Sequence, residues 1–137
     1  MRSIVITESD RRNLEAVLSS EFANVIGPLH RLDDLRAELQ RAQIVSPDEV
    51  SNDVVTMNST VVLCDLESGE RETYTLVFPR DADIAAGRLS VLAPIGTAIL
   101  GEHDGAEVHW RVPGGWRRLR IEEIVYQPER EGAFPLG

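Results

Sequence analysis

The sequence contains no lysine, and all 14 of its basic residues are arginine. This absence excludes a lysine that forms a Schiff base and a lysine that contacts nucleotide phosphates in a Walker motif. Cys64 is the only cysteine, so no disulfide can form within the chain, and a reducing compartment is expected. No segment approaches 18 consecutive apolar residues, and the apolar run at the N-terminus is too short for a signal peptide. We therefore expect a cytoplasmic protein that has no membrane segment.

Charge limits the partners further. The chain has 23 acidic residues and a formal net charge of −9, and the acidic excess extends over both its N-terminal and its C-terminal parts. Phosphate repulsion disfavours a wide nucleic-acid-binding face, so strong direct binding of nucleic acid is not expected. A length of 137 residues suits one compact domain with an appended element, and we expect a monomer.

The first 45 residues have the pattern of two amphipathic helices. Thr7 is suited to cap the first helix, with Asp10 as its capping-box partner. Gly27-Pro28 interrupts the pattern and begins a second helix of about 16 residues, in which apolar residues recur every three or four positions. The pattern predicts a short antiparallel helical hairpin, a coiled coil, over residues 1–45, followed by a linker over 46–57.

From residue 58 onward, alternating apolar residues indicate strands. The predicted strands are Thr60–Leu66, Arg71–Phe78, Leu89–Leu92, Glu107–Val112 and Trp116–Gln127, and one helix is predicted over Pro94–Leu100. A change of alternation near Glu122-Glu123 predicts a β-bulge in the last strand. The fold class is therefore α+β, with a sheet domain over residues 58–128 and a loose tail over 129–137.

The chain shows no catalytic constellation. His30, His103 and His109 are far apart in sequence and lie in unlike contexts, so they do not predict a metal site. Cys64 has no basic neighbour in sequence to activate it, which favours a structural thiol. We expect no cofactor, no metal and no enzymatic activity.

Two surfaces remain open to a docking role. Arg111, Arg118 and Arg120 are predicted to face outward on paired strands, either balanced by neighbouring glutamates or as a basic docking patch for an acidic partner. The tip of the helical hairpin contains Glu21 and Phe22 in a largely apolar loop, which either folds back onto the helices or contacts a partner.

Several segments together resemble a known family. Leu89-Ser90-Val91, Ala93-Pro94-Ile95-Gly96, Ala98–Gly101 and Pro113-Gly114-Gly115 resemble, in order and spacing, the C-terminal domain of the bacterial Gre transcript-cleavage factors. The N-terminal part resembles more specifically the Rnk regulators of nucleoside diphosphate kinase in the segments Asp34–Gln43, Ser46–Glu49 and Asp53–Ser59. Near the end of the chain, Tyr126–Glu129 matches these regulators as well. The resemblance extends over nearly the whole chain.

The resemblance implies an FKBP-like antiparallel sheet domain with one helix, preceded by a short coiled coil. It implies a non-enzymatic regulator that binds bacterial RNA polymerase at the rim of the secondary channel and competes with Gre factors. The polymerase-binding residues it implies are Ser90, Val91, Ala93 and Pro94. Gre factors carry acidic residues at the tip of a long coiled coil to bind magnesium, whereas this hairpin is short and offers only Glu21, so stimulation of transcript cleavage is not expected.

Two alternatives follow from the same resemblance. An FKBP-like fold is compatible with a peptidyl-prolyl isomerase, although aromatic residues make up only 5% of the chain, and such enzymes line their pocket with aromatic side chains. The Rnk likeness also implies a link to nucleoside diphosphate kinase, either direct or as an indirect result of altered transcription.

Overall fold

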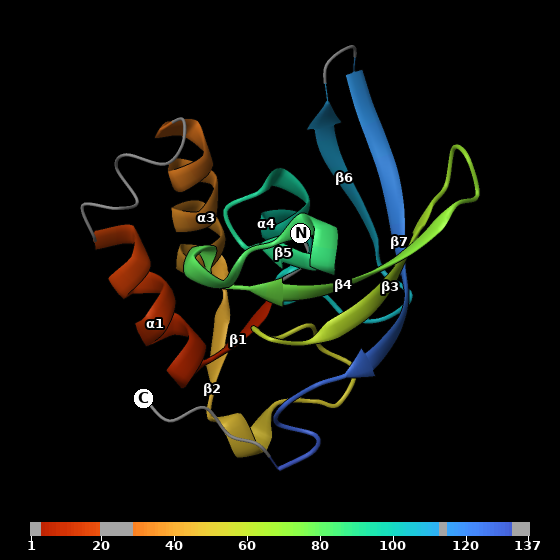
Figure 1. The fold of residues 1–137 in the computed structure, drawn as a ribbon. Coiled ribbons are helices and arrows are strands. Elements are labelled where there is room, and N and C mark those ends of the chain that lie inside the picture. The colour runs from red at the N-terminus through yellow and green to blue at the C-terminus, as the bar shows by residue number, and fades with distance from the viewer. Residues whose placement is uncertain (1–3, 20–28, 113–114, 133–137) are drawn as a thin grey trace.

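The computed structural model describes residues 4–19, 29–112 and 115–132. Its centre is a five-stranded sheet in which the strands follow the order β5-β4-β3-β7-β6 (Figure 1). The strands are β3 (Thr60–Asp65), β4 (Arg71–Val77), β5 (Arg88–Ser90), β6 (Glu107–Val112) and β7 (Gly115–Tyr126). This mixed helix-and-sheet architecture agrees with the predicted α+β class.

The sheet is antiparallel except at one edge. β3 pairs with both β4 and β7, and β6 pairs with β7, all in antiparallel register. β5 instead runs parallel to β4, with Leu76 opposite Leu89. The expectation of a wholly antiparallel sheet is therefore wrong at this edge. The connection contains the 3₁₀ turns η2 (Pro79–Asp81) and η3 (Ile84–Ala86), and it carries the chain across so that β5 enters in the direction of β4.

β7 is a long strand with two irregularities in its pairing with β3. The register shifts between Thr60 and Val61 and again between Val62 and Leu63. The second shift leaves one extra residue on β7 next to Glu123, which confirms the predicted bulge. As a result Leu119, Ile121 and Ile124 all face the core, although the last of them is out of phase with simple alternation.

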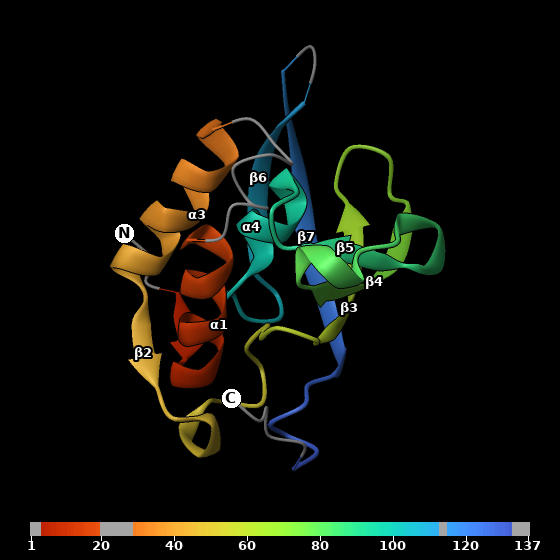
Figure 2. The same cartoon turned by 60° about the vertical axis from the view of Figure 1, so that its left-hand side comes forward.

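The N-terminal part contains α1 (Glu8–Ser19) and α3 (Leu29–Arg41), which lie side by side in both ribbon views (Figures 1 and 2). Short strands flank them: β1 (Val5–Thr7) and β2 (Gln43–Val45) pair in parallel, a sheet that the sequence analysis did not predict. The backbone amide of Val5 also donates to the carbonyl of Gly101 at 3.1 Å, which ties β1 to the end of the short helix α4 (Pro94–Ile99). None of the helices in the described ranges is long and apolar enough to cross a membrane.

One hydrophobic core joins the helices to the sheet. Leu14 of α1 and Leu35 of α3 are fully buried in the same cluster as Ile121 of β7. Residues 54–57, which the sequence analysis treats as linker, are also buried, and Val55 and Met57 belong to this cluster. Burial of apolar surface therefore holds the N-terminal helices against the sheet domain.

Candidate docking site

The turn between β5 and α4 contains the residues that the family resemblance implies for polymerase binding. It forms because β5 ends at Ser90 and because Pro94 occupies the first turn of α4, where a missing N–H costs nothing. The amide of Ala93 donates to the Ser90 carbonyl at 3.0 Å, and the amide of Leu92 donates to Ser90 Oγ at 3.1 Å. These two bonds close the turn locally.

The turn is also fixed from the helix side. Thr97 Oγ1 donates to the carbonyl of Val91 at 2.7 Å. Gly96 lies so close to the turn that a Cβ atom added to it would stand 2.1 Å from the Ser90 carbonyl oxygen. Hydrogen bonds and close packing together hold the backbone from Ser90 to Pro94 in one conformation.

The four implied binding residues differ in accessibility. Pro94 is exposed, while Ser90 and Ala93 are half-buried. Val91 has 0% of its surface exposed, and its amide donates to the carbonyl of Val77 at 2.9 Å. Val91 therefore supports the turn from the core side in this structure, and the surface that a partner could touch consists of the other three residues.

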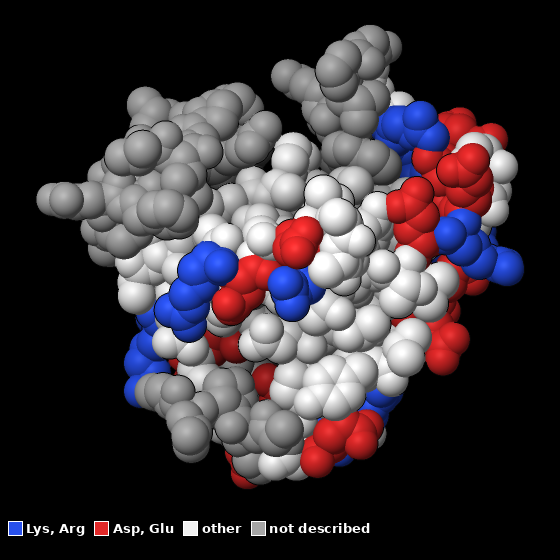
Figure 3. Space-filling view, in the orientation of Figure 1, with Lys and Arg blue, Asp and Glu red and all other residues white. Residues whose placement is uncertain are grey.

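Two of the arginines predicted to face outward, Arg118 and Arg120 of β7, have acidic partners. Arg118 lies 3.4 Å from Glu67 and 4.0 Å from Glu107, and Arg120 lies 3.6 Å from Glu122. Both arginines are exposed, as predicted, and the side chain of Arg111 lies outside the described part of the structure. On the face seen in Figure 3, acidic and basic side chains are interspersed. Neighbouring glutamates therefore lie within ion-pair distance of both Arg118 and Arg120.

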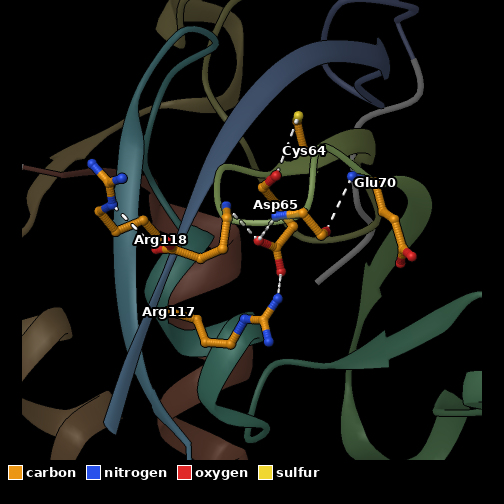
Figure 4. Close-up of polar contacts among 7 residues, drawn as sticks. Cys64, Asp65, Glu70, Arg117 and Arg118 are labelled. Atoms are coloured by element: carbon orange, nitrogen blue, oxygen red, sulfur yellow. Dashed lines mark hydrogen bonds and ion pairs between the residues drawn. The ribbon is translucent and has the colours of Figure 1, made fainter.

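Sequence reasoning missed Arg117, which forms an ion pair with Asp65 from the neighbouring strand (Figure 4). Asp65 Oδ1 also accepts the amides of Glu67 at 2.8 Å and Ser68 at 3.2 Å. Desolvation opposes ionisation here, but these amides and the Arg117 guanidinium hold the pKa of Asp65 below its usual value. An aspartate before the Ser68-Gly69 turn was the available sequence signal for this arrangement.

A buried polar junction was also missed. Thr7 caps α1 as predicted, because Asp10 donates its amide to Thr7 Oγ1 at 3.1 Å. The carboxylate of Asp10 does not serve the predicted capping box: it accepts the amide of Met57 at 3.0 Å. Nearby, Thr56 Oγ1 donates to Glu129 at 2.7 Å. In sequence, an acid in the first turn of a helix looks like an ordinary cap, so no local signal reveals this contact.

Glu21 and Phe22, the predicted tip residues, lie outside the described residues. Within the ranges that the structure describes, no group of three or more His, Cys, Asp or Glu side chains is arranged to hold a metal ion. The thiol of Cys64 is buried.

Residues 50–126 match the family described as "Transcription elongation factor, GreA/GreB, C-term". The chain is 40% identical over 135 residues to the Escherichia coli K12 protein named "Regulator of nucleoside diphosphate kinase", an alignment that covers 98% of this chain and 97% of the relative. It is 39% identical over 94 residues to transcription elongation factor GreA of Desulfotalea psychrophila, covering 69% of this chain and 58% of that protein.

A solved structure agrees with these matches. The "Prokaryotic transcription elongation factor GreA/GreB from Nitrosomonas europaea" superposes with a TM-score of 0.73 at 42% identity, covering 90% of this chain and all of that one. These relatives are named as regulators and transcription factors, not as enzymes. The chain therefore belongs to the family that shares the GreA/GreB C-terminal domain, and within it is similar along nearly its whole length to the regulators of nucleoside diphosphate kinase.

Proposed function

We propose that this chain is a non-enzymatic regulator of transcription elongation that binds bacterial RNA polymerase through its Gre-type domain. The observation that carries the proposal is the match of residues 50–126 to the GreA/GreB C-terminal family, within a chain similar along 98% of its length to a named regulator. By the family resemblance, the contact lies at the rim of the secondary channel and excludes Gre factors by competition.

The β5–α4 turn supports this proposal as the docking surface. Its backbone is fixed by the Thr97 and Ser90 hydrogen bonds, so Pro94 and Ala93 are presented without an ordering cost on binding. Binding surfaces that are organised before the partner arrives lose less conformational entropy. Ser90, Ala93 and Pro94 are the residues that we assign to the contact, with Val91 beneath them.

The N-terminal helices are proposed to act as a short probe at the channel mouth. We propose that α1 and α3 form a short antiparallel coiled coil on an FKBP-like sheet domain, in a monomeric cytoplasmic protein. Glu21 is the only acidic residue in the stretch from 20 to 28. Since Mg²⁺ prefers several oxygen ligands, we propose that the chain does not stimulate transcript cleavage.

A link to nucleoside diphosphate kinase is a second candidate, favoured by the name of the full-length relative. We propose that this link is indirect and follows from altered transcription. Purified kinase mixed with the purified chain separates the two cases: an unchanged kinase rate supports the indirect link, and a changed rate establishes a direct one.

The polymerase proposal is tested by a charge placed on the turn. Pro94→Glu should leave the fold intact, because glutamate is well tolerated in the first turn of a helix. We expect affinity for core RNA polymerase to fall about tenfold, which corresponds to about 1.4 kcal/mol. Val125→Glu introduces the same side chain at a residue that is 50% exposed on β7 and serves as the matched control. A folded Pro94→Glu protein with unchanged affinity would remove the turn from the contact.

A further inference from the structure

Two buried carboxyl groups meet where the N-terminal helices join the sheet domain. Asp10 is 2% exposed and Glu129 is 7% exposed. Asp10 lies in the first turn of α1, whereas Glu129 follows the end of β7, so the two groups come from opposite ends of the chain. Within the described residues, neither carboxylate forms an ion pair with an arginine. A buried charge without a counter-ion is costly, so this pair needs a physical account.

Each carboxyl holds the segment that lies between the two parts of the molecule. Asp10 Oδ2 accepts the amide of Met57 at 3.0 Å, and Glu129 Oε1 accepts the hydroxyl of Thr56 at 2.7 Å. Thr56 is also bound to Ser59, whose Oγ accepts the Thr56 amide at 2.9 Å. The two carboxyls thus hold adjacent residues, 56 and 57, from the two sides of the junction.

Among the described residues, the hydrogen-bond partners of the two carboxyls are polar and uncharged. From the end of β1, the hydroxyl of Thr7 bonds to Asp10. The segment 56–59 offers amides and hydroxyls, and β2 carries no titratable residue. Arg130, next to Glu129, directs its guanidinium to the carbonyls of Ile124 and Val125 and to Glu131. Glu129 Oε2 is buried, and the part of the chain that the structure describes supplies no hydrogen-bond partner for it.

We propose that Asp10 and Glu129 form a proton-dependent latch between the N-terminal helices and the sheet domain. With a proton on Asp10, α1 is held against residues 56–57 and the C-terminal segment. With both carboxyls ionised, two like charges repel each other inside the junction, and the hold on α1 loosens. The latch thereby makes the position of the helices relative to the sheet depend on pH.

The electrostatics of Asp10 place this transition in the physiological range. Burial raises the pKa of Asp10 to about 7, the Met57 amide opposes that rise, and the charge of Glu129 adds to it. A group with this pKa exchanges its proton over the pH interval in which most cytoplasmic proteins work. The hydrogen bonds of the two carboxyls to residues 56 and 57 form the latch, and the pKa of Asp10 sets the pH at which it opens.

The latch can be tested on the full-length protein alone, so its failure and the failure of polymerase binding remain distinguishable. Spin labels at Ala16→Cys and Glu70→Cys, both exposed positions, report the distance between α1 and the sheet in a Cys64→Ala background. We expect one narrow distance distribution at pH 5.5 and a broader or shifted one at pH 8.5, with a midpoint near 7.

Variants separate the latch from a general effect of pH. Asp10→Asn keeps an oxygen that can accept the Met57 amide but cannot ionise, so it should hold the narrow distribution at both pH values. Glu129→Gln should do the same by removing the repulsion, and it carries the test if Asp10→Asn fails to fold. Glu8→Gln removes an exposed carboxylate from the same helix and should leave the pH response unchanged.

Two results would overturn the latch. The first is a wild-type distance distribution that does not change between pH 5.5 and 8.5. The second is an unchanged pH response in folded Asp10→Asn and Glu129→Gln proteins, which would assign that response to other groups.

Discussion

At the scale of single residues, the conformation of the β5–α4 turn depends on a small residue, Gly96, as much as on a polar one, Thr97. Gly96 lets α4 pack onto Ser90 and Val91, and Thr97 Oγ1 satisfies the Val91 carbonyl. The segment Ala93–Gly96 was recognisable in the sequence as a motif, but the reason for its glycine was not. Only the approach of a carbonyl oxygen to 2.1 Å of a hypothetical Cβ explains why no side chain fits there.

Gly96→Ala should therefore destabilise the protein although alanine is the better helix former. Propensity alone favours alanine by about 1 kcal/mol, whereas overpacking against backbone costs about 1–3 kcal/mol. We expect the clash to prevail, because the atoms that Cβ meets belong to the backbone of Ser90 and Val91, which cannot move aside as a side chain can. Chemical denaturation of the variant and the parent protein measures the difference.

Gly69→Ala provides the comparison for this experiment. Gly69 has a φ of +79° and open space around its hypothetical Cβ, so alanine there meets backbone strain without a clash. That strain costs about 1 kcal/mol. A Gly96→Ala protein as stable as the parent would show that the β5–α4 turn relaxes, contrary to the rigid docking surface described above.

At the scale of elements, the turn between β3 and β4 is organised by one side chain. Asp65 accepts two amides of the turn and pairs with Arg117 of β7, so it links three strands (Figure 4). Arg117 lies opposite Trp110 in the β6–β7 register, so the strand that contacts Asp65 also pairs with β6.

Substitutions at Asp65 should lower the thermal midpoint in proportion to the number of its interactions that they remove. Asp65→Asn keeps an oxygen for the turn amides and loses the charge that attracts Arg117, while Asp65→Ala loses both. We expect the thermal midpoint to fall in the order wild type, Asp65→Asn, Asp65→Ala. Glu70→Ala, an exposed residue of the same turn, should have little effect. Equal midpoints for the two Asp65 variants would contradict the role assigned to the turn amides.

Some secondary-structure elements could be predicted from the sequence and others could not. Periodic apolar residues predicted the β3–β4 and β6–β7 strands to within a residue or two, and the shifted phase at Ile124 predicted the bulge. The pairing of β1 with β2 could not be predicted, because two three-residue strands carry too little pattern and are separated in sequence by both α1 and α3. The parallel entry of β5 depends on the path of residues 79–87, which no local periodicity specifies.

Among the candidate sites, too, those formed by adjacent residues could be predicted from the sequence, and those formed by distant residues could not. The turn around Pro94 could be located because its residues form a contiguous motif. The Asp10 contact could not, since it joins residues 47 positions apart and needs the folded junction to exist. Likewise, the burial of Val91 follows from its place beneath α4, and sequence alone had placed it among the contact residues.

At the scale of the whole molecule, Asp10 links stability to pH. Its folded-state pKa of about 7 lies above its ordinary value of 3.8, so the folded protein holds this proton more tightly than the unfolded chain does. This contribution to stability is complete below about pH 4 and is lost as the pH rises through about 7. One pKa unit corresponds to 1.36 kcal/mol, so the loss is at most roughly 4 kcal/mol.

Asp10→Asn isolates this contribution from the titration of the other carboxylates. The free energy of unfolding of wild type relative to that of the variant should decrease between pH 4.5 and 8. Urea denaturation of both proteins at several pH values supplies the comparison. A constant difference across that interval would contradict the assigned role of Asp10.

The whole molecule also determines how it would act on polymerase. A Gre-type domain with a fixed turn, attached to helices by a common core, suits a protein that occupies a site and carries a short element into it. We propose that this site is the one used by Gre factors.

The most direct test is binding of the purified chain to bacterial core RNA polymerase in the presence of increasing GreA. We predict mutually exclusive binding, so that GreA displaces the labelled chain to completion and the displacement curve follows simple competition. Absence of binding at micromolar concentration, or simultaneous binding of both proteins to one polymerase, would contradict the account.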